Sequence, residues 1–210
     1  MRCAIIVGAV LALILQASPA SAELLNLPFP HYPRVKAIGM TVTFELPEDP
    51  LPTDTGTFRA SGYTTEQYDY QIDDPDYPVY LDGDFLLEAV LNQDGSFVSG
   101  TLTVNADYFD PDNSMLFYSG TLADFGFGGA DLFEFKFTQQ GDMLAPDGEP
   151  VGVILSGVSI GFDPNTNPVV FTSGFANNDN GFCDVFYLPE PATAILLLAG
   201  LAVLRARGRP

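Results

Sequence analysis

Carboxylates gather in three short stretches of the sequence, and they form its clearest set of potential metal ligands. The stretches are Asp73-Asp74-Pro75-Asp76, Asp82-Gly83-Asp84 and the run from Asp107 to Asp112. Calcium accepts about six to eight oxygen ligands, so the candidate site would join Asp73, Asp74, Asp76, Asp82 and Asp84. None of the stretches has the spacing of an EF-hand loop, and aspartate is also a common turn residue. We favour acidic surface turns and expect no cofactor, with calcium as the alternative.

Tyrosines are interleaved with these acids between residues 63 and 80. A tyrosine presents an apolar ring and a polar tip, so an exposed tyrosine beside carboxylates can stack on a sugar ring and hydrogen-bond it. Tyr68, Tyr70 and Tyr77 are therefore candidate carbohydrate-binding residues. Tyrosines that alternate along a strand are also typical of sheet packing, and we favour packing.

The sequence contains few of the residues that perform nucleophilic or metal-assisted catalysis. His31 is the single histidine, and Cys183 is the single cysteine after residue 22. Neither a multi-histidine site nor a thiolate zinc site can be built from them. A carboxylate pair, as in glycoside hydrolysis, remains possible in principle, but no spacing singles out a pair. We therefore predict no enzymatic activity and no catalytic residues. For Cys183 we favour a half-buried structural thiol over pairing between chains or a nucleophilic role.

The elements that would position these residues are strands, because the apolar residues mostly alternate with polar ones. The clearest case is Phe133 to Thr138, where three phenylalanines face one way. Turn residues such as Asn92-Gln93-Asp94-Gly95 separate the alternating segments and indicate hairpins. Further alternating or apolar segments are Ile38 to Leu46, Phe85 to Leu91, Phe97 to Ala106, Met115 to Leu122 and Val151 to Leu155. We predict one all-β domain over residues 23–188, an antiparallel β-sandwich or jelly roll.

The predicted domain is strongly acidic. Residues 23–188 hold 26 of the 27 acidic side chains and four of the eight basic ones, which gives a net charge of −22 (4 minus 26). Such a charge repels phosphate backbones, so nucleic-acid binding is excluded. Cations, basic proteins and neutral polymers such as polysaccharide remain as partners. The alternative, which we favour, is that the charge serves only solubility outside the cell.

The first 22 residues have the order of a secretion signal. A basic residue precedes an apolar stretch from Ala4 to Leu15, and the small residues Ala20 and Ala22 stand ahead of Glu23. This pattern predicts cleavage between Ala22 and Glu23 by signal peptidase, and therefore export. The apolar stretch is shorter than the roughly 20 residues of a spanning helix, so we expect removal rather than anchoring.

The C-terminus has the order polar, apolar, basic. Pro189-Glu190-Pro191 is followed by uncharged residues 192–204 and then by Arg205, Arg207 and Arg209. The prolines prevent a helix from running back into the preceding domain, and the arginines favour the cytoplasmic side of the membrane. We predict a short transmembrane helix over residues 192–204. At about 1.5 Å per residue it is shorter than the roughly 30 Å hydrocarbon core.

The sequence from Leu188 to Thr193, the apolar run and the basic end together resemble the PEP-CTERM sorting signal over residues 189–210. That resemblance implies that an exosortase of the inner membrane recognises and processes the tail, in bacteria that secrete exopolysaccharide and biofilm matrix. We therefore expect an exported protein that passes through the inner membrane to the cell surface or extracellular matrix, with a structural or adhesive role. The alternative is a carbohydrate-binding or calcium-dependent module associated with exopolysaccharide.

Overall fold

The computed structural model describes residues 24–28, 34–68, 79–107, 114–128, 132–140, 148–158 and 171–188. The signal peptide and the tail predicted from the sequence, residues 1–22 and 189–210, lie outside the described residues. Within the described ranges, no helix has the length and apolar character needed to cross a membrane.

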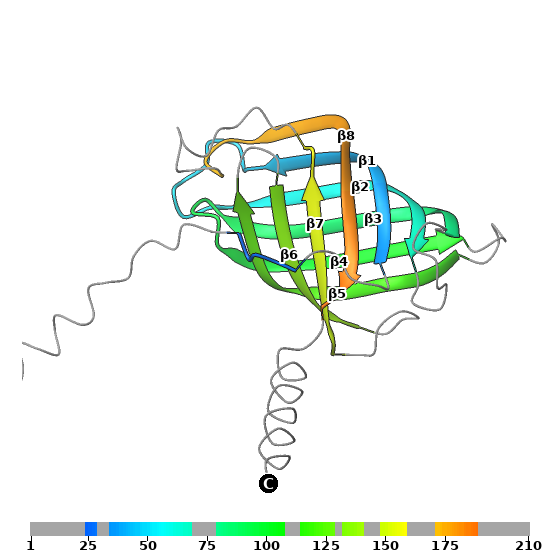
Figure 1. The fold of residues 1–210 in the computed structure, drawn as a ribbon. Helices are drawn as coiled ribbons and strands as arrows, with labels where there is room; N and C mark the ends of the chain where they lie inside the picture. The colour runs from blue at the N-terminus through cyan, green and yellow to red at the C-terminus, as the bar shows by residue number, and fades with distance from the viewer. Residues whose placement is uncertain are drawn as a thin grey trace, which may run out of the picture.

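Eight antiparallel strands form a single closed barrel (Figure 1). They are β1 (Arg34–Glu45), β2 (Thr55–Tyr68), β3 (Val79–Asn92), β4 (Phe97–Asp107), β5 (Ser114–Gly128), β6 (Leu132–Gln139), β7 (Pro150–Ser156) and β8 (Phe175–Tyr187). Each strand pairs with the next one in the sequence, and β8 pairs with β1. The barrel therefore has a seam at which the first and last strands meet.

The prediction of an antiparallel all-β fold is confirmed, but the sandwich or jelly roll is corrected to a closed barrel. A jelly roll divides its strands between two sheets, whereas every consecutive pair of strands is hydrogen-bonded here. The register shifts in β1, between Lys36 and Ala37 and between Ile38 and Thr41, mark irregularities of the bulge type. Bulges bend and twist a strand, which lets a sheet curve into a barrel.

The interior of the barrel is filled by apolar side chains from alternating positions. On β6, Phe133, Phe135 and Phe137 all point inward and are at most 2% exposed, as the sequence predicted. An eight-stranded barrel is about wide enough for side chains to fill it. Burial of this continuous apolar core is the main source of stability for the fold.

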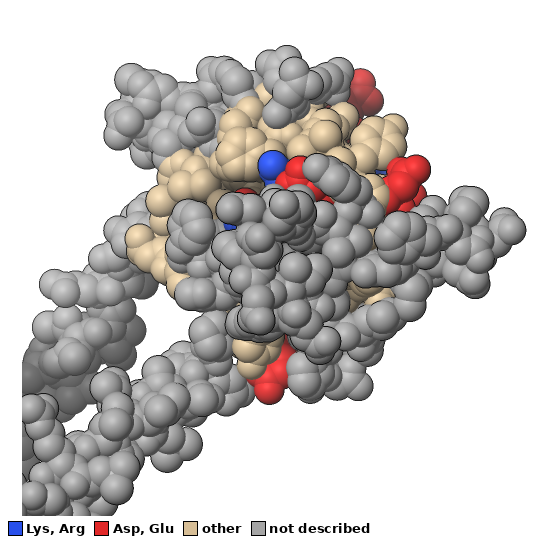
Figure 2. Space-filling model, turned by 45° about the vertical axis from the view of Figure 1, so that its right-hand side comes forward, with Lys and Arg blue, Asp and Glu red and all other residues tan. Residues whose placement is uncertain are grey.

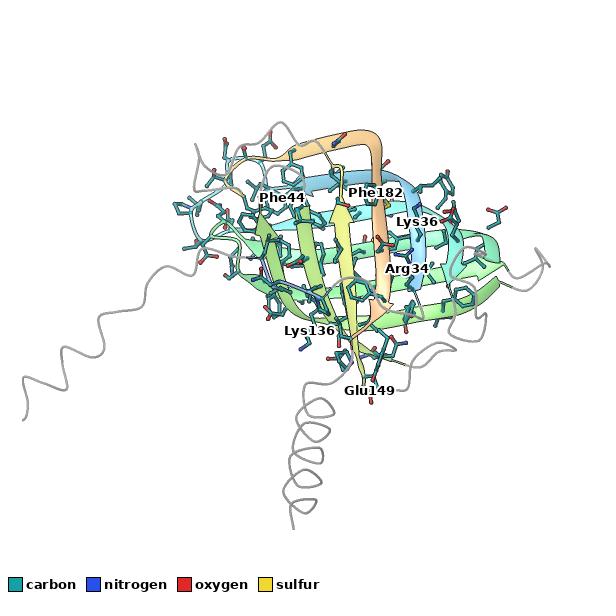
Figure 3. All side chains as sticks on the ribbon, viewed as in Figure 1. Arg34, Lys36, Phe44, Lys136, Glu149 and Phe182 are labelled. Carbon is teal, nitrogen blue, oxygen red and sulfur yellow. The ribbon has the colours of Figure 1, made fainter. Side chains whose placement is uncertain are left out.

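One end of the barrel is closed by a phenylalanine cluster. Its members come from β1, β2, β5, β6, β8 and the residues before β8: Phe44, Phe58, Phe125, Phe127, Phe133, Phe135, Phe171 and Phe175. Their rings contact one another, with centroids 4.9 Å apart for Phe44 and Phe171 and 4.8 Å apart for Phe125 and Phe135. Figure 3 shows Phe44 at this end and Arg34 toward the other. We call the other end, where β8 ends and the chain continues to Leu188, the exit end.

The N-terminal residues 24–28 form a strap on the outer wall of β6. The carboxylate of Glu134 accepts hydrogen bonds from the backbone N–H of Asn26 at 2.8 Å and of Leu27 at 3.3 Å. Glu134 is only 5% exposed although it points out of the barrel. A Cβ on Gly128 of β5 would lie 2.6 Å from Cγ of Leu24, so the strap packs directly on the sheet there.

Candidate functional site

Three large apolar or aromatic side chains lie side by side on the outer wall of the barrel. Phe182 of β8 is opposite Ile38 of β1, and Ile38 is opposite Tyr63 of β2. Their exposed fractions are 43%, 43% and 63%. We call Phe182, Ile38 and Tyr63 the outer row. Contiguous exposed apolar side chains mark interaction sites more often than single ones do, so this row is the first candidate for function.

An open depression of about 370 Å³ adjoins the outer row at Tyr63. Its lining comes from β1, β2 and β3 and includes Thr41, Arg59, Ser61, Tyr63, Asp84 and Leu86. Asp84 is opposite Tyr63 in the register of β2 and β3, so it extends the outer row by one strand. The apolar row and the polar depression therefore form one continuous surface.

An irregularity in β1 shapes this surface. The register shifts between Ile38 and Thr41 against β2, and Gly39 has a φ of 64°. Glycine adopts that left-handed conformation without steric cost. A Cβ on Gly39 would lie 3.6 Å from Cδ2 of Tyr63, so the backbone there supports the tyrosine ring. On β2, a Cβ on Gly62 would lie 2.7 Å from the carbonyl oxygen of Ile38, so only glycine permits this close approach.

The depression offers hydrogen-bonding groups of several kinds. Thr41 and Ser61 are opposite each other and supply hydroxyl groups, which both donate and accept. Asp84 supplies an exposed carboxylate. Arg59 lies with Nη1 3.6 Å from Oε1 of Glu88, and both side chains are about half exposed. This set can hydrogen-bond a ligand that carries many hydroxyl groups.

A charged row borders the outer row on the side of the exit end. Lys36 lies with Nζ 3.5 Å from Glu66, and Arg34 lies with Nη1 3.7 Å from Asp184. Figure 3 shows Arg34 and Lys36 between Phe182 and the exit end, and Figure 2 shows basic and acidic groups adjoining a patch of uncharged residues. Burial raises the pKa of Asp184 above its usual range, and Arg34 and Lys36 offset part of that rise.

The carboxylates proposed for calcium are only partly described. Asp82 and Asp84 both lie exposed on β3, and Asp82 is opposite Asp107 of β4. Asp73, Asp74 and Asp76 lie outside the described residues. Among the side chains that the structure does describe, no three of His, Cys, Asp and Glu are grouped as metal ligands. The five-carboxylate calcium site stays a prediction.

The tyrosine at the depression is not one of the three proposed from the sequence. Tyr68 ends β2 opposite Arg34, while Tyr70 and Tyr77 lie outside the described residues. Tyr63, from the same tyrosine-rich stretch, is the one that adjoins Asp84. The other sites predicted from the sequence also lie outside the described residues: Ala20, Ala22, Glu23, Pro189, Glu190, Pro191, Arg205, Arg207 and Arg209.

Phe182 and Arg59 were missed by sequence reasoning. Phe182 belongs to a stretch in which both alternating phases contain apolar residues, Phe182 and Phe186 in one, Cys183 and Val185 in the other. Such a pattern does not reveal which phase faces out. The register with Ile38 settles it, because residues of one row share a face.

Cys183 lies inside the barrel and is 0% exposed, so it is more deeply buried than the half-buried thiol expected. Desolvation raises the pKa of this thiol well above its usual range, and the neighbouring charge of Asp184 adds to the effect. The reactive thiolate is therefore disfavoured in the folded barrel.

Comparison with known proteins found no match to this chain among family models, curated proteins or solved structures. The functional proposals therefore rest on the residues of this chain.

Proposed function

We propose that this is an exported, non-enzymatic protein of the cell surface or extracellular matrix, and that its barrel serves a structural or adhesive role. Two features of the sequence support export and sorting: the signal-like order of residues 1–22 and the resemblance of residues 189–210 to a PEP-CTERM signal. Signal peptidase and an exosortase are the processing partners in this proposal, and the membrane is contacted through residues 192–204.

The outer row is the observation that carries the adhesive role. Phe182, Ile38 and Tyr63 keep between 43% and 63% of their surface exposed on adjacent strands. An apolar strip on the outside of a filled barrel contributes nothing to the core. It is suited to lie against a partner surface, because burial on contact would recover the hydrophobic free energy.

A carbohydrate-binding module is the second candidate, and one specific observation favours it. Tyr63 stands at the edge of the depression directly opposite Asp84, with the hydroxyls of Thr41 and Ser61 nearby. A ring beside donors and acceptors matches the two faces of a sugar, one apolar and one lined with hydroxyl groups. The calcium-dependent form of this candidate rests on Asp73, Asp74, Asp76, Asp82 and Asp84, of which the first three lie outside the described residues.

Fractionation of the native host tests the sorting proposal. The full chain and a chain lacking residues 189–210 are each produced in that host, and each fraction is examined by intact mass. We expect the full chain to lose its signal peptide and to reach the cell surface or matrix, and the truncated chain to be mislocalised. A matched variant with Arg205, Arg207 and Arg209 replaced by Gln keeps the length of the tail and should behave like the truncation. Unchanged mass and location in both would contradict the proposal.

A further inference from the structure

We propose that the outer row and the adjoining depression form one binding surface for an extended, neutral polysaccharide, with Phe182 and Tyr63 each stacking on a sugar ring. This inference rests on the proposed function, since it requires the barrel to be a surface or matrix protein. To the proposed function it adds the binding site, the class of ligand and the direction in which the ligand crosses the sheet.

The spacing of the two rings follows from sheet geometry. Neighbouring strands lie about 4.7–4.9 Å apart, and Phe182 and Tyr63 are separated by one intervening strand, β1. Their Cα atoms are therefore about 10 Å apart across the sheet. That is close to the distance between alternate rings in an extended chain of β-linked hexoses. Ile38 lies between them and can contact the ring in the middle.

The depression supplies the polar contacts that a stacked sugar needs. A stacked ring directs its hydroxyl groups sideways, and each of them both donates and accepts hydrogen bonds. Beside Tyr63, the carboxylate of Asp84 can accept, the guanidinium of Arg59 can donate, and the hydroxyl of Ser61 can do both. Polar contacts of this kind fix the orientation of a ligand that apolar contact alone leaves free to slide.

The charges around the surface select a neutral polymer over an anionic one. Three cations flank it, and each has an acidic partner within 3.7 Å: Arg34 with Asp184, Lys36 with Glu66, and Arg59 with Glu88. A polyuronate would have to compete with those carboxylates for every cation. It would also approach a region of net charge −22, which repels polyanions.

A second copy of the chain is a poorer occupant than a polymer. A stable protein interface buries about 800 Å² on each partner, far more than three partly exposed side chains provide. Two copies meeting through this face would also bring together Asp84, Glu66 and Asp184 of each strongly acidic barrel. A thin, uncharged chain lying across β8, β1 and β2 avoids both problems.

Affinity electrophoresis of the purified full-length chain tests the proposal, with a soluble mixed-linkage β-glucan in the gel as the neutral probe and alginate as the anionic one. We expect the glucan to retard the wild type and alginate to leave its mobility unchanged. Tyr63→Ala and Phe182→Ala should each weaken glucan binding by about tenfold, the scale of one lost stacking contact. Tyr63→Phe keeps the ring and should retain most of the binding.

Val98→Ala is the matched control, because Val98 is 54% exposed near the start of β4, a strand that carries no residue of the outer row. It should bind glucan as the wild type does. Thermal melting of every variant separates loss of binding from loss of the fold.

Three results would overturn the inference: no retardation of the wild type by glucan, equal binding by Tyr63→Ala, or preference for alginate. A dimer in analytical ultracentrifugation that Tyr63→Ala abolishes would assign the row to a second copy instead. These failures are distinct from failure of the proposed function. If the tail still directs the protein to the surface while glucan does not bind, only the ligand is wrong.

Discussion

The barrel holds aromatic side chains in two settings, the phenylalanine cluster inside and the outer row across β8, β1 and β2. Inside, Phe135 is fully buried and contacts the rings of Phe58 and Phe125. Outside, Phe182 and Tyr63 keep about half of their surface in solvent. Side chains of the same chemical type therefore have different consequences: the inner rings stabilise the fold, and the outer ones are those that we propose to bind a ligand. Position in the strand register decides which.

The largest effect is expected from truncation inside the barrel. Phe135→Ala should lower the free energy of unfolding by about 3–5 kcal/mol, because it removes a buried ring and leaves a cavity among Phe58, Phe125 and Phe137. Urea unfolding measures it. Phe182→Ala on the outer row is the matched control and should change stability by no more than about 0.5 kcal/mol. Similar losses in the two variants would break the comparison.

The strap adds a third setting to this comparison, because Glu134 points out of the barrel and is nevertheless only 5% exposed. Glu134→Ala leaves the backbone N–H groups of Asn26 and Leu27 without their acceptor, at a cost of about 1–3 kcal/mol. Hydrogen exchange should show faster exchange at those two amides. Glu134→Gln retains one acceptor oxygen, so its exchange rates at these amides should lie between those of Glu134→Ala and the wild type. Exchange unaffected by either change would show that Glu134 does not hold the strap.

Asp184 on the outer wall should make the stability of the barrel depend on pH. Its pKa is raised in the fold from an ordinary value of 3.8, so between those two pKa values the folded state binds more protons than the unfolded state. Stability contributed by this group therefore falls as pH rises through that window, and the loss is complete above the folded pKa. Asp184→Asn should remove this pH dependence, so the stability of the variant should increase relative to that of the wild type as pH rises. Urea unfolding measured over this pH range checks it. A constant difference in the free energy of unfolding between the variant and the wild type would contradict the prediction.

The smallest effect is expected at Tyr63. Because its ring is 63% exposed, Tyr63→Ala should leave the free energy of unfolding within about 0.5 kcal/mol of the wild type. Thermal melting measures this without any ligand. A larger loss would show that the ring is a packing residue supported by Gly39, and would weaken its assignment to a binding surface.

Local patterns predicted a large part of the fold. The alternation of Phe133 to Thr138 marks β6, and Asn92 to Gly95 forms the turn between β3 and β4. There the N–H of Asn92 donates to Ser96 at 2.8 Å, and Gly95 has a φ of 84°. Closure was not predictable in this way. Closure depends on the pairing of β1 with β8. The alternation of inward apolar and outward polar residues is the same in a barrel and in a sandwich, so it does not distinguish them.

The candidate site was hidden for a related reason. Two of the three strands that carry the outer row, β2 and β8, are absent from the segments predicted by alternation. On β2 several inward positions are small residues, Gly56, Ala60 and Gly62. The strand therefore lacks the regular series of large apolar residues that marks an alternating segment. Ile38, Tyr63 and Phe182 are each unremarkable in the sequence, and only the non-local register makes them neighbours.

The pairing of the first and last strands has a mechanical consequence. β1 begins and β8 ends at the exit end, so a force that pulls the start of β1 away from the end of β8 would unzip the seam one hydrogen bond at a time instead of shearing all of them together. The outer row crosses that seam, with Phe182 on β8 and Ile38 and Tyr63 beyond it. A polymer bound across the row would contact both sides of the seam, so the barrel would resist opening more strongly with the polymer bound than without it.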